Sequence, residues 1–315
     1  MEIRGYTKGD ELAIIALFEI TFKQKMSLEQ WNWRFTNNPA GKHWIKLMWQ
    51  EGQLIGHYAV SPLIMEINGK EVMTAHSLAT MTHPEHGGKG IFKALSNALY
   101  DDLEKNLGCK AIWGFPNNNS HYGFVNSLDW KDIGVIHTLG MAFHNAQHQT
   151  SHVIIEEFEN FSSAHVAFID KNIHSYTIKV KRSTAYLNWR YTEKPAVKYK
   201  KFFGQIEGIN YLAVTKIYPT GKPEIWDLNI VELYVDDHKI VNQLIAAIGK
   251  VYSLNFDRVI TWKNLHNKEH IQLEKLGFVL THPQTYLSAR IHADMNSEFR
   301  EMKNWYFSMG DSDVF

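Results

Sequence analysis

The chain has 315 residues, of which 44% are hydrophobic and 21% charged, a composition that excludes collagen-like and disordered proteins. Its 33 basic and 33 acidic side chains cancel, which excludes a strong field toward nucleic acid or an anionic membrane and leaves small or neutral molecules as the expected partners. The single cysteine, Cys109, suits a reducing compartment, and neither an export signal nor an apolar membrane span is visible, so we expect a cytoplasmic protein of about two domains.

Strands and helices alternate along the first half of the sequence. Apolar residues recur with period two in the strand segments and on one stripe of the helical segments, and Asn68-Gly69 favours a tight hairpin between two long strands. We expect strands over residues 3–6, 44–49, 54–67, 71–81 and 111–115, a helix capped by Asp10, a Trp-Arg helix near residue 34, and helices over 91–107 and 119–128. This order predicts an α+β fold with a mixed, mostly antiparallel sheet flanked by helices.

A nine-residue segment occurs twice. Residues 32–40 read NWRFTNNPA and residues 188–196 read NWRYTEKPA, so six of nine positions agree and a seventh is aromatic in both. Further similarities follow in the same order, since AIWG at 111–114 resembles VITW at 259–262 and both precede an Asn-rich turn. Two tandem copies of one domain explain this pattern, and we place them at residues 1–148 and 149–315.

A glycine-rich turn links the fourth expected strand to the next helix. Residues 82–95 read THPEHGGKGIFKAL, and glycines at a helix start let backbone N–H groups surround a phosphate or pyrophosphate. A Walker loop is disfavoured because Lys89 is followed by Gly90 and not by Ser or Thr. A dinucleotide fingerprint is disfavoured because the turn follows a long antiparallel hairpin.

These residues make the first half similar to the GNAT superfamily of N-acetyltransferases. Members carry a Gln/Arg-x-x-Gly-x-Gly/Ala loop whose amides hold the pyrophosphate of acetyl-CoA; the sequence matches at Gly90 and departs at Gly87 and Phe92. Residues 114–130 resemble the fifth strand, Asn turn and helix that follow, and the likeness covers about residues 3–143. The Phe-Pro-Asn turn and the Trp-Arg helix also resemble a bacterial subgroup found beside surface-polysaccharide genes.

The resemblance implies an N-acyltransferase that uses acetyl-CoA or another acyl-CoA, without a metal, and passes the acyl group to a small amine, amino sugars included. It implies coenzyme contacts at Ala79, Thr80, Met81, Gly87, Gly88, Lys89, Gly90, Ile91, Phe92, Asn117, Asn118 and Ser120. In the second half, Asp236 and Asp237 stand where the first half has the glycines, and their carboxylates would repel a pyrophosphate. We therefore expect a degenerate second copy that binds no coenzyme.

Candidate catalytic residues follow from the chemistry of acyl transfer, which needs a base for the ammonium proton and an acid for the thiolate. His76 on the fourth strand is the candidate base, with Leu78 and Thr80 expected on the same strand face. The tyrosine that the family uses as acid is missing, and Tyr122 and His121 are the nearest replacements.

Two other functions remain open at the level of the sequence. The first is an acyl-CoA sensor that binds without turnover, which the missing tyrosine permits. The second is an aminoacyl transferase similar to the Fem family, whose members take the acyl group from transfer RNA. The neutral net charge does not suit this polyanion, and the glycine loop suits a coenzyme instead. The acceptor, the acyl length and the oligomeric state do not follow from the sequence.

Overall fold

The computed structural model describes residues 1–147, 153–291 and 297–315 and divides into two units. Unit 1 comprises Met1–Gly134, Glu193–Ala196 and Tyr286–Arg300, and unit 2 comprises Val135–Thr192, Val197–Thr285 and Glu301–Phe315. Each unit therefore contains segments from both halves of the chain. The expected boundary between residues 148 and 149 lies outside the described residues.

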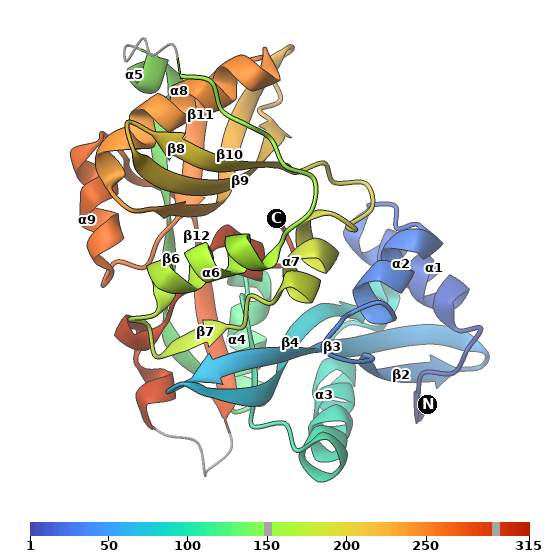
Figure 1. The fold of residues 1–315 in the computed structure, drawn as a ribbon. Helices are drawn as coiled ribbons and strands as arrows, with labels where there is room; N and C mark the ends of the chain where they lie inside the picture. Colours follow the sequence, from blue (N-terminus) through green and yellow to red (C-terminus); the bar gives the residue numbers. More distant parts are fainter. Residues whose placement is uncertain (148–152, 292–296) are drawn as a thin grey trace. The chain divides into compact units, whose positions relative to one another are not determined.

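Unit 1 is built on a mixed sheet (Figure 1). Its elements are β1 (Glu2–Gly5), α1 (Glu11–Phe22), α2 (Leu28–Phe35), β2 (Trp44–Gln50), β3 (Gln53–Ile67), β4 (Lys70–Thr82), the 3₁₀ turn η1 (Pro84–His86), α3 (Ile91–Asp102), the π-turn η2 (Leu103–Leu107), β5 (Ala111–Gly114), α4 (Asn118–Ser127), the start of β6 (Lys131–Ala142), the end of β12 (Val279–Ile291) and η4 (Ser297–Arg300). Strands β1 to β4 are antiparallel, β5 is parallel to β4, and β12 is antiparallel to β5.

The sequence predicted these elements well, with two corrections. The helix expected over 91–107 is α-helical only to Asp102. A short π-helix follows and ends at Gly108, which has the left-handed conformation. Asp10 stands at the N-cap of α1 but does not cap it, because its carboxylate accepts two hydrogen bonds from Arg4 at 2.7 Å.

Apolar clusters hold the helices against both faces of the unit 1 sheet. Helix α3 packs on one face, and α1 and α2 pack on the other, as Figure 1 shows. Gly56 on β3 permits the close approach of α3, since a Cβ there would lie 2.5 Å from Cγ2 of Ile91 and 2.9 Å from Cδ1 of Leu95. This contact places the first turn of α3 beside the end of β4.

Unit 2 repeats this plan in the second half of the chain. It holds the end of β6, α5 (Phe143–Gln147), α6 (Ser163–Ile173), β7 (Ile178–Val180), α7 (Thr184–Tyr191), β8 (Lys200–Ile206), β9 (Ile209–Pro219), β10 (Ile225–Val235), η3 (His238–Ile240), α8 (Val241–Tyr252), β11 (Asn255–Trp262), α9 (Lys268–Lys275), the start of β12, η5 (Met302–Asn304) and η6 (Met309–Asp311). Strands β8 to β10 are antiparallel, β11 is parallel to β10, and β6 is antiparallel to β11.

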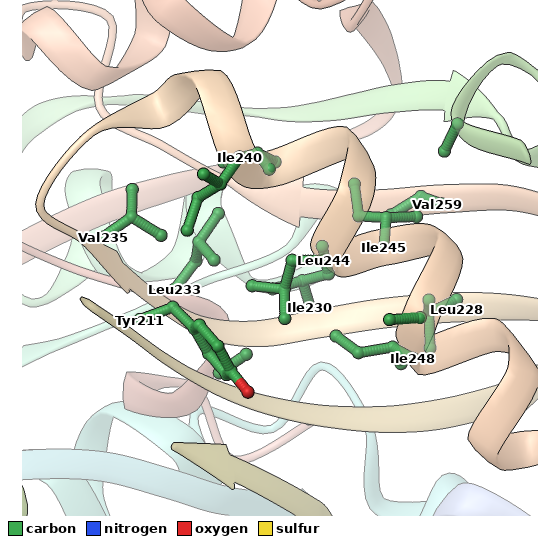
Figure 2. Packing of buried hydrophobic residues seen from close by; sticks show 14 of the residues in the cluster. Tyr211, Leu228, Ile230, Leu233, Val235, Ile240, Leu244, Ile245, Ile248 and Val259 are labelled. Carbon is green, nitrogen blue, oxygen red and sulfur yellow. The ribbon is translucent and has the colours of Figure 1, made fainter. Parts of the chain in front are cut away.

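The core of unit 2 lies between α8 and its sheet. Figure 2 shows Leu244 and Ile248 of α8 beside Ile230 and Leu228 of β10, and Ile245 beside Val259 of β11. These side chains are at most 1% exposed, and burying each one stabilises the fold by about 1.5–3 kcal/mol.

A buried charge cluster secures the last residues of the chain within unit 2. The Arg182 guanidinium is fully buried and donates to Asp311 at 2.8 Å, to Glu232 at 3.3 Å and to the Tyr234 hydroxyl at 3.0 Å. Removal of one member of such a cluster leaves an uncompensated charge in the core, which makes it a structural feature of this unit.

The two Trp-Arg helices have the same local structure. Helices α2 and α7 each have eight residues, each begins after a serine that accepts an amide hydrogen bond, and each ends at a threonine whose N–H donates to the asparagine four residues earlier, at 2.8 Å. The order helix, three antiparallel strands, helix, parallel strand, helix and closing strand recurs in both halves. This recurrence supports the tandem-copy hypothesis, which stays a proposal.

No helix within the described ranges has both the length and the apolar character needed to cross a membrane.

Candidate active site

The glycine turn of unit 1 leads directly into α3. Gly88 and Gly90 both have φ of +74°, and Gly90 is the N-cap residue, with no side chain accepting from the first amides of the helix. The first turn of α3 contains no acidic residue, so nothing there opposes an anion. A helix N-terminus of this kind presents several N–H donors to a phosphate group.

There is room for a ligand beside this turn. Residues 87–90 are exposed, and a Cβ built on Gly88 or on Gly90 would meet no atom within 4 Å. The Lys89 ammonium lies 3.4 Å from Nδ1 of His86 and adds positive charge to the turn. The residues present therefore fit the pyrophosphate of an acyl-CoA.

Phe92 explains one departure from the GNAT loop pattern. Its ring packs edge-on against Phe124 of α4 at 5.1 Å and against Tyr58 at 6.1 Å, measured between ring centroids. A Cβ on Gly123 would lie only 3.2 Å from this ring. The large side chain thus turns into the contact between α3 and α4, so an aromatic residue here does not block the helix terminus.

Strand β4 carries a bulge next to this turn. His57 pairs with Met81 and Ala59 pairs with Leu78, so Ala79 and Thr80 together lie opposite the single residue Tyr58. Ala79 has φ of +50°, which is uncommon for a residue other than glycine. A bulge leaves the extra residue unpaired and frees its backbone groups for hydrogen bonds outside the ladder.

His57 holds the bulge from β3. Its Nδ1 lies 2.7 Å from the Ala79 carbonyl oxygen, and the ring is fully buried. Burial lowers the pKa of His57 to about 4, so the imidazole is neutral at pH 7 and donates its Nδ1 proton to that carbonyl. Sequence reasoning missed this residue, because a histidine in an apolar strand gives no local signal of a contact 22 residues away.

The bulge also corrects the expected strand faces. Leu78 and Met81 belong to the same buried cluster beneath α1 and α2. The expectation that Thr80 shares the face of Leu78 is therefore wrong, because the extra residue reverses the alternation after Ala79. His76 precedes the bulge, and its position relative to Leu78 is as expected.

His76 lies deep in unit 1. It is 6% exposed, it pairs across the parallel ladder with Trp113, and its ring lies 4.9 Å from the ring of Trp113 and 5.9 Å from that of Phe115. This setting gives a candidate base that is enclosed by aromatic rings at the junction of β4 and β5.

The Asn turn after β5 caps α4. The Asn117 side chain accepts from the amides of Asn119 and Ser120 at 3.0 and 3.2 Å, and Asn118 is exposed in the first turn. Asn117 therefore uses its side-chain oxygen within the protein. Its part in the site is to begin α4 at the same edge of the sheet as the glycine turn, since β4 and β5 are parallel.

The two replacement candidates for the missing tyrosine differ in their surroundings. Tyr122 is 74% exposed. His121 is held: Nε2 lies 2.7 Å from Oδ1 of Asp132, and the ring stacks on Tyr286 with centroids 3.7 Å apart. Asp132 and Tyr286 were also missed, because neither belongs to a motif in the sequence.

Cys109 is not part of this site. Its side chain is 2% exposed and its Sγ donates to the Ala111 carbonyl, and burial raises the pKa of the thiol to about 11. The thiolate needed for nucleophilic attack is therefore scarce at neutral pH.

In unit 2, the turn before α8 differs from the glycine turn before α3. Asp237 accepts from the Lys239 amide at 3.0 Å, and Asp236 pairs with Lys171 at 2.8 Å and with Asn210. A carboxylate thus takes up an amide donor ahead of α8, where the turn before α3 has only glycines. Among residues 1–147, 153–291 and 297–315, no three His, Cys, Asp or Glu side chains form a group that could hold a metal ion.

Unit 1 combines a mixed sheet with a bulged fourth strand, an open glycine turn and a parallel fifth strand, and this arrangement is GNAT-like. Residues 2–133 match the sequence model of a family described as "Acetyltransferase (GNAT) domain". No curated protein matches the chain.

Solved structures share this fold at low sequence identity. A probable N-acyltransferase from Enterococcus faecalis is 14% identical with a TM-score of 0.68, and 92% of this chain aligns with 72% of that one. A GCN5-related N-acetyltransferase from Anabaena variabilis is 13% identical with a TM-score of 0.65 and the same coverage. The Saccharomyces cerevisiae N-myristoyltransferase with bound myristoyl-CoA is 9% identical with a TM-score of 0.59, over 91% of this chain and 82% of that one.

Proposed function

We propose that unit 1 transfers an acyl group from acyl-CoA to the amine of a small acceptor, amino sugars included, and that the second half is a tandem copy without a coenzyme site. The observation that carries this proposal is the open glycine turn at the uncapped start of α3, beside the β4 bulge. The match of residues 2–133 to the GNAT family supports it.

The proposed reaction uses both the glycine turn before α3 and the β4 bulge. The pyrophosphate binds the amides at the start of α3, and the pantetheine arm runs toward the released backbone groups around Ala79 and Thr80. The amine attacks the thioester carbon, its proton passes to a base, and the carbon–sulfur bond breaks to release the CoA thiol. His76, His121 and Tyr122 are the proposed proton-transfer groups.

The substitution Gly90→Asp tests the coenzyme site. A carboxylate at the start of α3 repels the pyrophosphate, and φ of +74° adds strain. We expect at least a hundredfold loss of acyl-CoA affinity in calorimetric titration. Gly208→Asp is the matched control, since Gly208 has φ of +76° and open space around its Cβ position but lies in the turn between β8 and β9. Equal affinity in the two variants would overturn the site.

Graded acyl-CoAs and an amine panel test the reaction itself. The family match points to acetyl-CoA, whereas the likeness to N-myristoyltransferase makes long-chain acyl-CoA worth including. The proposal expects thiol release only when both an acyl-CoA and an accepted amine are present. Binding without turnover across amino sugars, amino acids and polyamines would favour the sensor function, which the missing family tyrosine permits.

A further inference from the structure

His121 is fixed from two sides within unit 1. Asp132 on β6 accepts at 2.7 Å from Nε2, and the Tyr286 ring lies parallel to the imidazole within 7°. The carboxylate is itself oriented, since the Ser288 hydroxyl donates to the same oxygen at 2.7 Å. Within the part of the chain that the structure describes, Asp132 and Tyr286 are the titratable side chains in contact with this imidazole.

Two residues that support His121 and Asp132 come from β12, near the C-terminal end of the sequence. Tyr286 and Ser288 lie on β12, which pairs with β5 through Ser288 and Gly114. The Tyr286 N–H donates to the Pro116 carbonyl at 3.3 Å, so the same residue fixes the turn before α4 and the histidine on it. Ser288 is fully buried, which gives the carboxylate a rigid support.

His121 lies on α4, at the edge of the sheet where β5 ends. It is the fourth residue of α4, which starts where β5 ends, and Gly123 two positions later contacts the Phe92 ring in the first turn of α3. Helix α4, which carries His121, therefore packs against the first turn of α3, while His121 itself faces Asp132 and Tyr286. The His121 side chain is 21% exposed, so an acceptor can reach it.

We propose that His121 and Asp132 form the general-base dyad of the acyl transfer, with Ser288 and Tyr286 as positioning residues. This proposal rests on the function proposed above. The Nε2 proton donates to Asp132, which leaves the lone pair of Nδ1 for the acceptor. The amine nitrogen bonds to the thioester carbon, its proton goes to Nδ1, the carbon–sulfur bond breaks, and the imidazolium returns the proton to the departing thiolate, which gives an amide and free CoA.

Three variants test the dyad against coenzyme binding. We expect His121→Ala to lower kcat by about a hundredfold or more, with acyl-CoA affinity within twofold of wild type. Asp132→Asn should lower kcat at least tenfold, leave KM for acyl-CoA unchanged and move the acid limb of the kcat–pH profile to lower pH. Asp129→Asn is the matched control, because Asp129 is exposed and pairs with Lys131, and it should stay within twofold of wild type.

Two results would overturn the proposal while the proposed function stands: a kcat of His121→Ala within threefold of wild type, or equal effects of the Asp132 and Asp129 substitutions. Imidazole ¹⁵N spectra give a readout besides activity, and a proton on Nδ1 of His121 in place of Nε2 would also overturn it. A wild-type protein that turns over no acyl-CoA would instead refute the proposed function.

Discussion

Single residues set the geometry of the proposed site through contacts that are distant in sequence. The positive φ of Ala79 is stabilised because its carbonyl, displaced from the ladder by the bulge, has a buried donor in His57. Such a donor must stay neutral, since a charged imidazole in this apolar cluster would be expensive to bury.

The pH dependence of stability follows from His57. The unfolded imidazole takes up a proton near pH 6.5, whereas the folded one does so only near pH 4, so the free energy of unfolding falls as pH is lowered between these values. One pKa unit corresponds to about 1.4 kcal/mol, which makes this contribution on the order of 3 kcal/mol. We expect His57→Gln to be less stable at pH 7 and to lose less stability by pH 4, as measured by urea unfolding.

Two comparisons sharpen this test. His174→Gln is the control, because it makes the same substitution at an exposed histidine. Burial also lowers the pKa of His238 to about 4, so the His57 variant should retain part of the pH dependence. An identical slope in wild type and His57→Gln would show that His57 is not the group responsible.

At the scale of elements, the position of α3 depends on one glycine. The first two turns of α3 lie on β3 because Gly56 has no side chain, and the amides proposed to bind the coenzyme are the first groups of that helix. The packing of α3 on β3 therefore also sets the position of the N-terminus of α3.

We expect Gly56→Val to cost about 1–3 kcal/mol of stability and to weaken acyl-CoA binding, because its Cβ displaces Ile91 and Leu95 and with them the helix. Thermal unfolding and calorimetry measure the two effects. Gly5→Val is the control, since a Cβ at this strand glycine meets nothing within 4 Å. Wild-type affinity in a folded Gly56→Val protein would separate helix packing from coenzyme binding.

At the scale of the whole chain, the two units have a similar order of elements but differ in the turns before α3 and α8. The turn before α3 is made of glycines, whereas the turn before α8 has Asp237 accepting from a backbone amide. Both units bury large apolar clusters, so the absence of a glycine turn before α8 is compatible with a packed core in unit 2.

This difference predicts one coenzyme per chain. Calorimetric titration with acyl-CoA should give a stoichiometry near one, and Gly90→Asp should remove the whole signal because unit 2 offers no second site. A stoichiometry of two, or a residual signal in the variant with unchanged heat per mole, would contradict the assignment of unit 2.

Local patterns in the sequence determined most of the elements. Apolar periodicity predicted the strands and helices, Asn68-Gly69 predicted the hairpin of β3 and β4, and Gly87 to Gly90 predicted the turn before α3. The repeated Trp-Arg segment predicted two helices with the same ends, because caps and turns depend on a few neighbouring residues.

What only the tertiary structure decided lies between residues far apart in the chain. The bulge that puts Met81 on the face of Leu78 is bonded by His57, and His121 is contacted by Asp132 and Tyr286. These contacts cannot be predicted from local pattern, because strand register and side-chain pairing are set by the whole sheet. The sequence thus determined the glycine turn and its helix, and the fold decided which histidine is held by a carboxylate and an aromatic ring.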